Sequence, residues 1–489
     1  MKFIPVILTL LFVQSISAQE FSFAHQLFEE YETYLEQTIQ ERRFTQSDID
    51  PLIKDLSEHA LFDVKQVGES VEERPIYLVR IGNGDKIILF WSQMHGDEST
   101  ATMALLDLFN FFSEENDSFS EEKQNMLENV SLYFIPMLNP DGAEIFMRRN
   151  ALGIDVNRDA LRLTSPEAQV LKSVRDSLNP EFGFNLHDQS AYYTAGRVPE
   201  AATLSFLAPA YDFERSENEV RTRAMRLIAY LNSMLQHYIP GGVAKYSDAH
   251  EPRAFGDMIQ KWGTSTILIE SGGYPDDPEK QYIRKLNFVT ILTAIKAISE
   301  DTFRDESVED YYDIPENESY LTDLLIRNAN MVKDGKEYLV DLNIRQREQM
   351  IGDTNEYYYR ASISDIGDLS TQYGYEELDA EGLKMVAGEI YPDTLKNEQE
   401  LNNLDFPKLL RQGYTDVYLE NPPDTSFVTD VPLNIISEEG YDNKIGLGEI
   451  PNLVLKTNDG QVRYVIVNGF VYDVESGETE SILNTIVVK

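Results

Sequence analysis

The residues of this chain best suited to chemistry are two histidines, two glutamates and an arginine that lie far apart in the sequence. His95 and Glu98 form a His-x-x-Glu motif, while His187 and Glu270 each end an apolar run. Two imidazoles and a carboxylate are the ligand set of a catalytic zinc, which keeps its remaining position open for water. A further carboxylate beside that water can act as a general base, and an arginine such as Arg158 can hold a substrate carboxylate. The pattern indicates a zinc hydrolase that recognises a terminal carboxylate.

The composition limits how a metal could be held. The chain contains no cysteine and only 6 histidines among 489 residues. Disulfides, thiolate ligands and a cysteine nucleophile are therefore excluded, and any metal must be held by imidazoles and carboxylates. A His-x-x-Glu motif alone is weak support, because a surface pair in a glutamate-rich chain has the same spacing. It gains weight from its place after an apolar run and a turn at Gly96.

Strand-like runs lead into three of these side chains. Residues 86–91 precede His95, residues 182–186 end at His187, and residues 265–269 end at Glu270. Helical patterns lie between and after them, at residues 98–112, 166–177, 219–235 and 276–298. Alternation of this kind predicts an α/β fold with a mixed, mainly parallel sheet flanked by helices. The chemical residues fall at the carboxyl ends of strands, where open α/β sheets build their sites.

Further motifs carry a resemblance to a known family. Asn-Pro-Asp-Gly occupies residues 139–142, two arginines follow at 148 and 149, and Gly-Ile-Asp-Val-Asn-Arg occupies residues 153–158. With the His-x-x-Glu motif and the strands ending in His187 and Glu270, this order resembles the zinc carboxypeptidases of the carboxypeptidase A type. The resemblance covers roughly residues 55–300.

The resemblance implies a role for each residue around the metal. His95, Glu98 and His187 would be the ligands of one zinc ion. Asp155 would accept a hydrogen bond from the other ring nitrogen of His95 and fix its tautomer. Glu270 would take a proton from the zinc-bound water and pass it to the leaving amine.

The resemblance also implies residues that bind substrate. Asn157 and Arg158 would hold the terminal carboxylate of a peptide. Arg148 or Arg149 would polarise the scissile carbonyl; the motif order does not decide between them, and we slightly favour Arg148. A tyrosine on a loop before the general base would be Tyr246, although His250 is also placed to donate a hydrogen bond.

Two positions depart from the family pattern without removing a catalytic group. Asp159 follows Arg158 where many relatives carry Asn, and Asp188 follows His187 where Ser or Gly is common. The added negative charge near zinc could raise the basicity of the ligands or alter the approach of the substrate.

The chain divides into five segments by composition. Residues 1–18 read as a signal peptide, with Lys2, an apolar run too short to span a bilayer and a small polar stretch, so we expect export to the periplasm or beyond the cell. A helical lead-in at 19–54, the zinc carboxypeptidase-like domain at 55–300 and an acidic linker at 301–318 follow. Residues 319–489 lack histidine and carry strand patterns, including a hairpin signal at Asn468-Gly469, which predicts a β-rich accessory domain.

The net charge of −42 restricts the partners. A negatively charged protein is repelled by nucleic acid and by anionic membrane surfaces. No segment after the signal is long and apolar enough to cross a bilayer. The expected partner is a peptide with a free C-terminal carboxylate. Cell-wall peptides and N-acyl amino acids present the same chemistry and remain alternatives, as does a binding protein that has lost turnover.

Overall fold

The computed structural model describes residues 21–351, 357–421, 431–437, 441–476 and 487–488. The predicted signal peptide, residues 1–18, lies outside these residues. The chain forms two compact units, Met1–Ser319 and Tyr320–Lys489.

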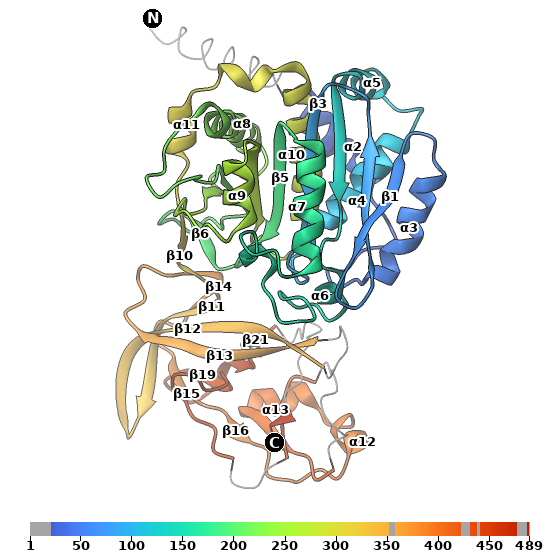
Figure 1. Cartoon of the computed structure of the whole chain (residues 1–489). Helices are drawn as coiled ribbons and strands as arrows, with labels where there is room; N and C mark the ends of the chain where they lie inside the picture. Colours follow the sequence, from blue (N-terminus) through green and yellow to red (C-terminus); the bar gives the residue numbers. More distant parts are fainter. Residues whose placement is uncertain (1–20, 352–356, 422–430, 438–440, 477–486, 489) are drawn as a thin grey trace, which may run out of the picture. The chain divides into compact units, whose positions relative to one another are not determined.

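A sheet of eight strands in the order β1-β2-β4-β3-β5-β9-β7-β8 forms the first unit (Figure 1). Its strands are β1 Asp63–Glu69, β2 Pro75–Ile81, β3 Lys86–Trp91, β4 Val130–Ile135, β5 Phe182–Asp188, β7 Leu204–Leu207, β8 Val243–Lys245 and β9 Ser265–Ser271. The central strands β4, β3, β5 and β9 are parallel, whereas β2 is antiparallel to both its neighbours and β7 is antiparallel to β9. The mixed, mainly parallel sheet expected from the sequence is confirmed.

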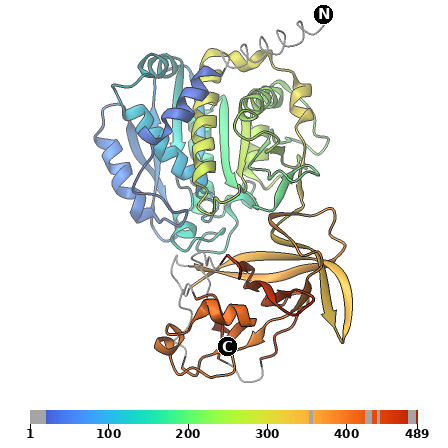
Figure 2. The same ribbon diagram turned by 180° about the vertical axis from the view of Figure 1, so that it is seen from behind.

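Helices cover both faces of this sheet. One face carries α2 Ser22–Glu30, α4 Thr100–Ser113, α5 Ser120–Asn129, α8 Glu219–Leu235 and α10 Gln281–Glu300, and α10 crosses in front of the sheet in Figure 2. The other face carries α7 Pro166–Leu178 and α9 Phe255–Lys261. Strand β3 serves both cores, because Phe90 packs into the first and Trp91 into the second. A strand buried on both faces explains why this segment reads as a continuous apolar run.

Local signals set several element boundaries. Ser165 accepts a hydrogen bond from the amide of Ala168, so it caps α7, and Pro166 occupies the first helical position. Asn139 instead starts a short helix, α6 Pro140–Glu144, by accepting from the amide of Gly142. The Asn-Pro-Asp-Gly segment is therefore a capped helix start.

The two segments expected to flank the catalytic domain are part of it. In the lead-in, η1 Tyr31–Thr33 and α3 Gln46–Glu58 join α2 in the main core. The expected linker, residues 301–318, instead forms η3 Thr302–Asp305, α11 Val308–Asp313 and β10 Asn317–Ser319, which pairs with β6 Tyr193–Ala195. Phe303, Tyr311 and Ile314 are buried in the core, so sparse apolar anchors outweigh the acidic background of this segment.

The second unit contains two sheets. The larger has strands in the order β13-β12-β11-β15-β19-β20-β21, with β14 beside β11. These are β11 Leu321–Lys333, β12 Lys336–Met350, β13 Tyr357–Gly367, β14 Tyr373–Asp379, β15 Lys384–Ala387, β19 Leu453–Lys456, β20 Val462–Val467 and β21 Phe470–Asp473. Asn468 and Gly469 both have positive φ, at 49° and 82°, and form the predicted hairpin turn between β20 and β21.

The smaller sheet was not anticipated. Its strands β16 Glu389–Ile390, β17 Tyr414–Tyr418, β18 Asn434–Ile436 and β22 Val487–Val488 are all parallel, and α12 Glu398–Leu401 and α13 Phe406–Gln412 lie before β17. The unit is β-rich, as expected, but it also contains this parallel α/β element.

None of the helices in the described residues combines the length and apolar character needed to cross a membrane.

Candidate metal centre

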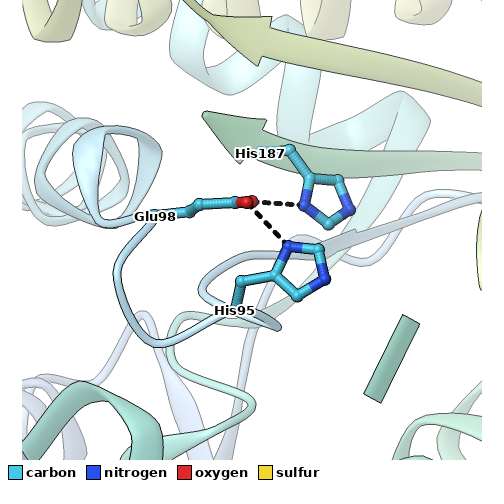
Figure 3. Close-up of side chains that lie close together, drawn as sticks. All are labelled: His95, Glu98 and His187. Atoms are coloured by element: carbon cyan, nitrogen blue, oxygen red, sulfur yellow. Dashed lines mark hydrogen bonds and ion pairs between the residues drawn. The ribbon is translucent and has the colours of Figure 1, made fainter. Parts of the chain in front are cut away.

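Three buried side chains converge beyond the carboxyl ends of two neighbouring parallel strands (Figure 3). His95 and Glu98 lie in the loop between β3 and α4, and His187 lies near the end of β5. Nδ1 of His95 is 2.8 Å from Oε1 of Glu98, and Nδ1 of His187 is 2.6 Å from Oε2 of the same carboxylate. The ligand atoms of the three residues all lie within 4.8 Å of one another.

The loop that carries His95 and Glu98 can form only because Gly96 has no side chain. A Cβ at this position would lie 2.0 Å from the backbone carbon of Gly142 in α6. Gly96 therefore allows the two loops to approach closely and directs His95 toward β5. The Gly142 end of this contact belongs to the Asn-Pro-Asp-Gly motif, which explains how that motif supports the site.

The second nitrogen of each imidazole also has a partner. Nε2 of His95 is 3.2 Å from Oδ1 of Asp155, as the sequence predicted. Nε2 of His187 is 3.3 Å from Nδ2 of Asn157, a contact that the sequence did not reveal. Oδ1 of Asn157 accepts from the amide of Phe255, so this side chain links α9 to the metal centre. Outer partners of this kind hold an imidazole in the orientation that a metal needs.

The charges of the cluster suit a cation. Although burial works against it, the positive charges and hydrogen bonds of the two histidines lower the pKa of Glu98. Burial alone would lower the pKa of His95, but the charge of Glu98 and the hydrogen bonds to Asp155 and Glu98 raise it to about 9. Burial lowers the pKa of His187. In this arrangement the protonated imidazole of His95 balances the charge of Glu98, and a zinc ion held by the three residues would supply positive charge in its place.

Glu270 lies next to His187 because β9 pairs in parallel with β5, with Glu270 opposite His187 in the register. Burial raises the pKa of the Glu270 carboxyl well above its usual range, and the negative charges of Glu98 and Asp188 act in the same direction. A carboxylate whose proton affinity is raised in this way is suited to accept and return a proton.

The two adjacent arginines occupy different places. Arg148 reaches the metal centre: its Nη1 is 3.2 Å from Oε1 of Glu98, and its Nη2 is 3.0 Å from Oδ2 of Asp155. Arg149 donates from Nη1 to the carbonyl of Gly153 at the surface. The geometry favours Arg148 as the group near the scissile carbonyl, and a substrate role for Arg149 stays a prediction.

The remaining sequence candidates differ in their surroundings. Arg158 is 38% exposed in its side chain, donates from Nη1 to the carbonyl of Asn157, and lies 3.9 Å from Glu251. Burial and the charge of Glu270 raise the pKa of Tyr246, so its phenol stays protonated near the site. Nδ1 of His250 lies 2.9 Å from the carbonyl oxygen of Ala210 and 3.1 Å from Oδ1 of Asp257. The role expected of Tyr246 or His250 stays a prediction.

Comparison with known proteins agrees with this geometry. Residues 52–204 match the sequence model of a family described as zinc carboxypeptidase. The segment includes His95, Glu98 and His187 and ends before Glu270. These residues are therefore similar to the zinc carboxypeptidase family, which agrees with the resemblance found in the sequence and with zinc as the ion that His95, Glu98 and His187 would hold.

Individual relatives are distant. Carboxypeptidase SOL1 of Arabidopsis thaliana is 26% identical over 201 residues, which is 34% of this chain and 40% of that protein. Carboxypeptidase D of Homo sapiens is 24% identical over 216 residues, or 37% of this chain and 15% of that protein. The chain thus spans less than half the length of these two relatives. The solved metallo-carboxypeptidase from Burkholderia cenocepacia aligns at 17% identity with a TM-score of 0.44, covering 53% of this chain and 70% of that chain.

Proposed function

We propose that the chain is an exported zinc metallocarboxypeptidase that hydrolyses the C-terminal bond of peptides with a free terminal carboxylate. The observation that carries the proposal is the buried His95–Glu98–His187 group beside Glu270 on the neighbouring strand. Export rests on the composition of the first 18 residues alone.

Arg158 would receive the substrate carboxylate. Its guanidinium is partly exposed, and Glu251 is too distant, at 3.9 Å, for a normal hydrogen bond. The carbonyl of Asn157 holds Nη1 at 2.8 Å and so orients the planar group. An oriented guanidinium can bind a carboxylate through two parallel hydrogen bonds, which favours a free C-terminus over an amidated one.

Arg148 would act on the bond to be cleaved. Glu98 and Asp155 hold its guanidinium at the edge of the metal centre, while 41% of the side chain stays exposed. A cation fixed beside the reacting carbonyl stabilises the negative charge that develops on its oxygen.

Glu270 would act as general base and then as general acid. Zinc, when held by His95, Glu98 and His187, supplies a Lewis acid that acidifies water and polarises the carbonyl. Glu270 accepts a proton from the water while the water oxygen bonds to the carbonyl carbon. It then passes this proton to the amine nitrogen as the C–N bond breaks. The products are a free amino acid and a peptide shortened by one residue.

Mass spectrometry of reaction products tests the proposal. The secreted protein would be incubated with a peptide mixture, with and without a zinc chelator, and the same peptides amidated at the C-terminus would serve as controls. Chelator-sensitive loss of single residues from the free-acid peptides alone is the expected result.

Two further substrate sets separate the alternatives. Cleavage confined to muropeptides would replace the proposal with a cell-wall hydrolase, and cleavage confined to N-acyl amino acids would replace it with a deacylase. Zinc-loaded protein that cleaves none of these substrates would refute hydrolysis and favour a binding role.

A further inference from the structure

We propose that Lys280 is a positioning residue that ties together the carboxyl ends of β5 and β9 and thereby fixes the spacing between His187 and Glu270. The inference rests on the proposed function, because it concerns the geometry of the same reaction. It assigns a role to Lys280 and to Asp188, one of the two positions at which this chain departs from the pattern of the zinc carboxypeptidases that it resembles.

The contacts of Lys280 join the two strands just beyond the reacting side chains. Its Nζ lies 3.0 Å from Oδ2 of Asp188 and donates to the carbonyl of Ser271 at 3.0 Å. Asp188 directly follows His187, and Ser271 directly follows Glu270. Asp188 and Ser271 are also paired in the strand register, so the ammonium bridges one rung beyond the pair formed by His187 and Glu270.

Asp188 extends the tie to the third ligand. Its Oδ2 accepts from Oγ1 of Thr100 at 2.5 Å, at the start of α4, and its backbone amide donates to Oε2 of Glu98 at 3.3 Å. Lys280 therefore anchors a carboxylate that touches the elements carrying His187 and Glu98. A shift of this carboxylate would displace β5, β9 and the loop that carries Glu98 together. Small shifts of reacting groups have large effects on the reaction rate.

The backbone of Lys280 is specialised for this contact. The residue precedes α10 with φ 53° and ψ 33°, in the left-handed region that residues other than glycine rarely adopt. Its side chain is only 11% exposed and that of Asp188 only 8%, so a charge pair is held out of water at the edge of the site. An unfavourable backbone conformation that delivers a buried ammonium between two functional strands points to a positioning role.

The opposite end of the same strand pair provides a matched control. Nη1 of Arg223 lies 2.9 Å from Glu181, just before β5, and its Nε donates to Oγ of Ser265 at the start of β9. Arg223 therefore bridges β5 and β9 as Lys280 does, but at the end remote from the metal centre. A general contribution to sheet stability would be shared by both bridges, whereas positioning of the site belongs to Lys280 alone.

The test compares Lys280→Met and Arg223→Met in the full-length protein, measuring kcat, KM, zinc content and melting temperature. We expect Lys280→Met to lower kcat at least about tenfold while KM changes less than about twofold and zinc stays bound. Arg223→Met should retain the kcat of the unmodified protein. A loss of kcat shared equally by both variants, or an unchanged kcat in Lys280→Met, would overturn the proposal.

A second variant covers a folding failure. Lys280→Gln keeps a donor that can reach Ser271 or Asp188, so it should fold and lose part of kcat at constant KM; full activity would overturn the positioning role. Failure of this inference is distinguishable from failure of the proposed function. In the first case the unmodified protein cleaves peptides, and only the comparison among the variants contradicts the inference. In the second case the unmodified protein itself cleaves no peptide.

Discussion

Each unit of the molecule contains a buried carboxylate surrounded by hydrogen-bond donors, but the donors differ in kind. In the first unit, Glu98 lies between the imidazoles of His95 and His187. In the second, Asp416 accepts from the amides of Asn434, Asn443 and Asn452 and from the hydroxyl of Thr415.

The pKa values of the two carboxylates shift in opposite directions, although burial acts to raise both. The charges of the histidines outweigh burial and lower the pKa of Glu98. Burial raises the pKa of Asp416 to about 6, because the hydrogen bonds from its neutral partners lower it by less than burial raises it. Imidazoles can give up a proton and bind a metal in its place, but amide nitrogens cannot. The difference teaches that a buried carboxylate becomes a metal centre through the donors around it. Around Asp416 the same arrangement serves to join β17 and β18 to the segment before β19.

Replacing a buried carboxylate by the amide of the same shape should have its largest effect on function at Glu98. Glu98→Gln removes the negative ligand while preserving shape, so we expect zinc content and peptidase activity to fall by at least about 10²-fold, with the fold retained. Zinc analysis, turnover and circular dichroism on one preparation measure all three. A Glu98→Gln protein that binds zinc normally would show that the comparison is wrong.

Removing the carboxylate receptor should have a smaller effect that depends on the substrate. Arg158→Ala loses charge-assisted hydrogen bonds, so kcat/KM for free-acid peptides should fall roughly 10- to 100-fold. Any slow hydrolysis of the matching amidated peptides should be unaffected. An equal loss on both substrates would assign Arg158 a structural role.

At Asp416 the isosteric change should affect stability alone. Asp416→Asn replaces one accepting oxygen by an NH2 group that faces hydrogen-bond donors. This should lower the free energy of unfolding of the second unit by about 1–3 kcal/mol without changing zinc content or kcat. Trp91 and Trp262 both lie in the first unit, so their fluorescence reports on that unit, while circular dichroism reports on both. The expected result is a shift of the dichroism transition without a shift in fluorescence. A loss of activity would show that the two clusters are not independent.

The smallest expected effect is the pH dependence of that stability. The pKa of Asp416 is about 6 in the folded unit, against 3.8 for an unperturbed aspartate, so protonation favours the folded state. Its contribution is complete below pH 3.8 and is lost as the pH rises through about 6. The stability difference between the unmodified protein and Asp416→Asn should therefore shrink between pH 5 and pH 7, as measured by urea unfolding; a constant difference would contradict the raised pKa.

Much of the first unit could be predicted because its signals are local. Helix α8 has the predicted bounds, and the strands that carry His187 and Glu270 follow apolar runs that both faces of the sheet require. The motifs picked out His95, Glu98, His187 and Asp155 by their order in the chain, and the structure brings these four side chains together. These features depend on residue type and spacing, which the sequence displays directly.

Other features depend on contacts between distant segments. The choice between Arg148 and Arg149 required the loop conformation, and the contact of Asn157 with His187 required the position of α9. Residues 301–318 seemed a linker because their acidic residues outnumber the three apolar anchors that fix them. The parallel sheet of the second unit has short strands separated by long segments, which leave no clear periodicity.

The most direct test of the central claim measures zinc and turnover together in the unmodified protein and in Glu270→Gln. General-base catalysis contributes about 10²- to 10⁴-fold, so the variant should retain one zinc ion and lose at least about 10²-fold in kcat on free-acid peptides. That result would place the proton transfer on Glu270 beside an intact metal centre. A zinc-loaded Glu270→Gln protein with ordinary turnover would contradict the account.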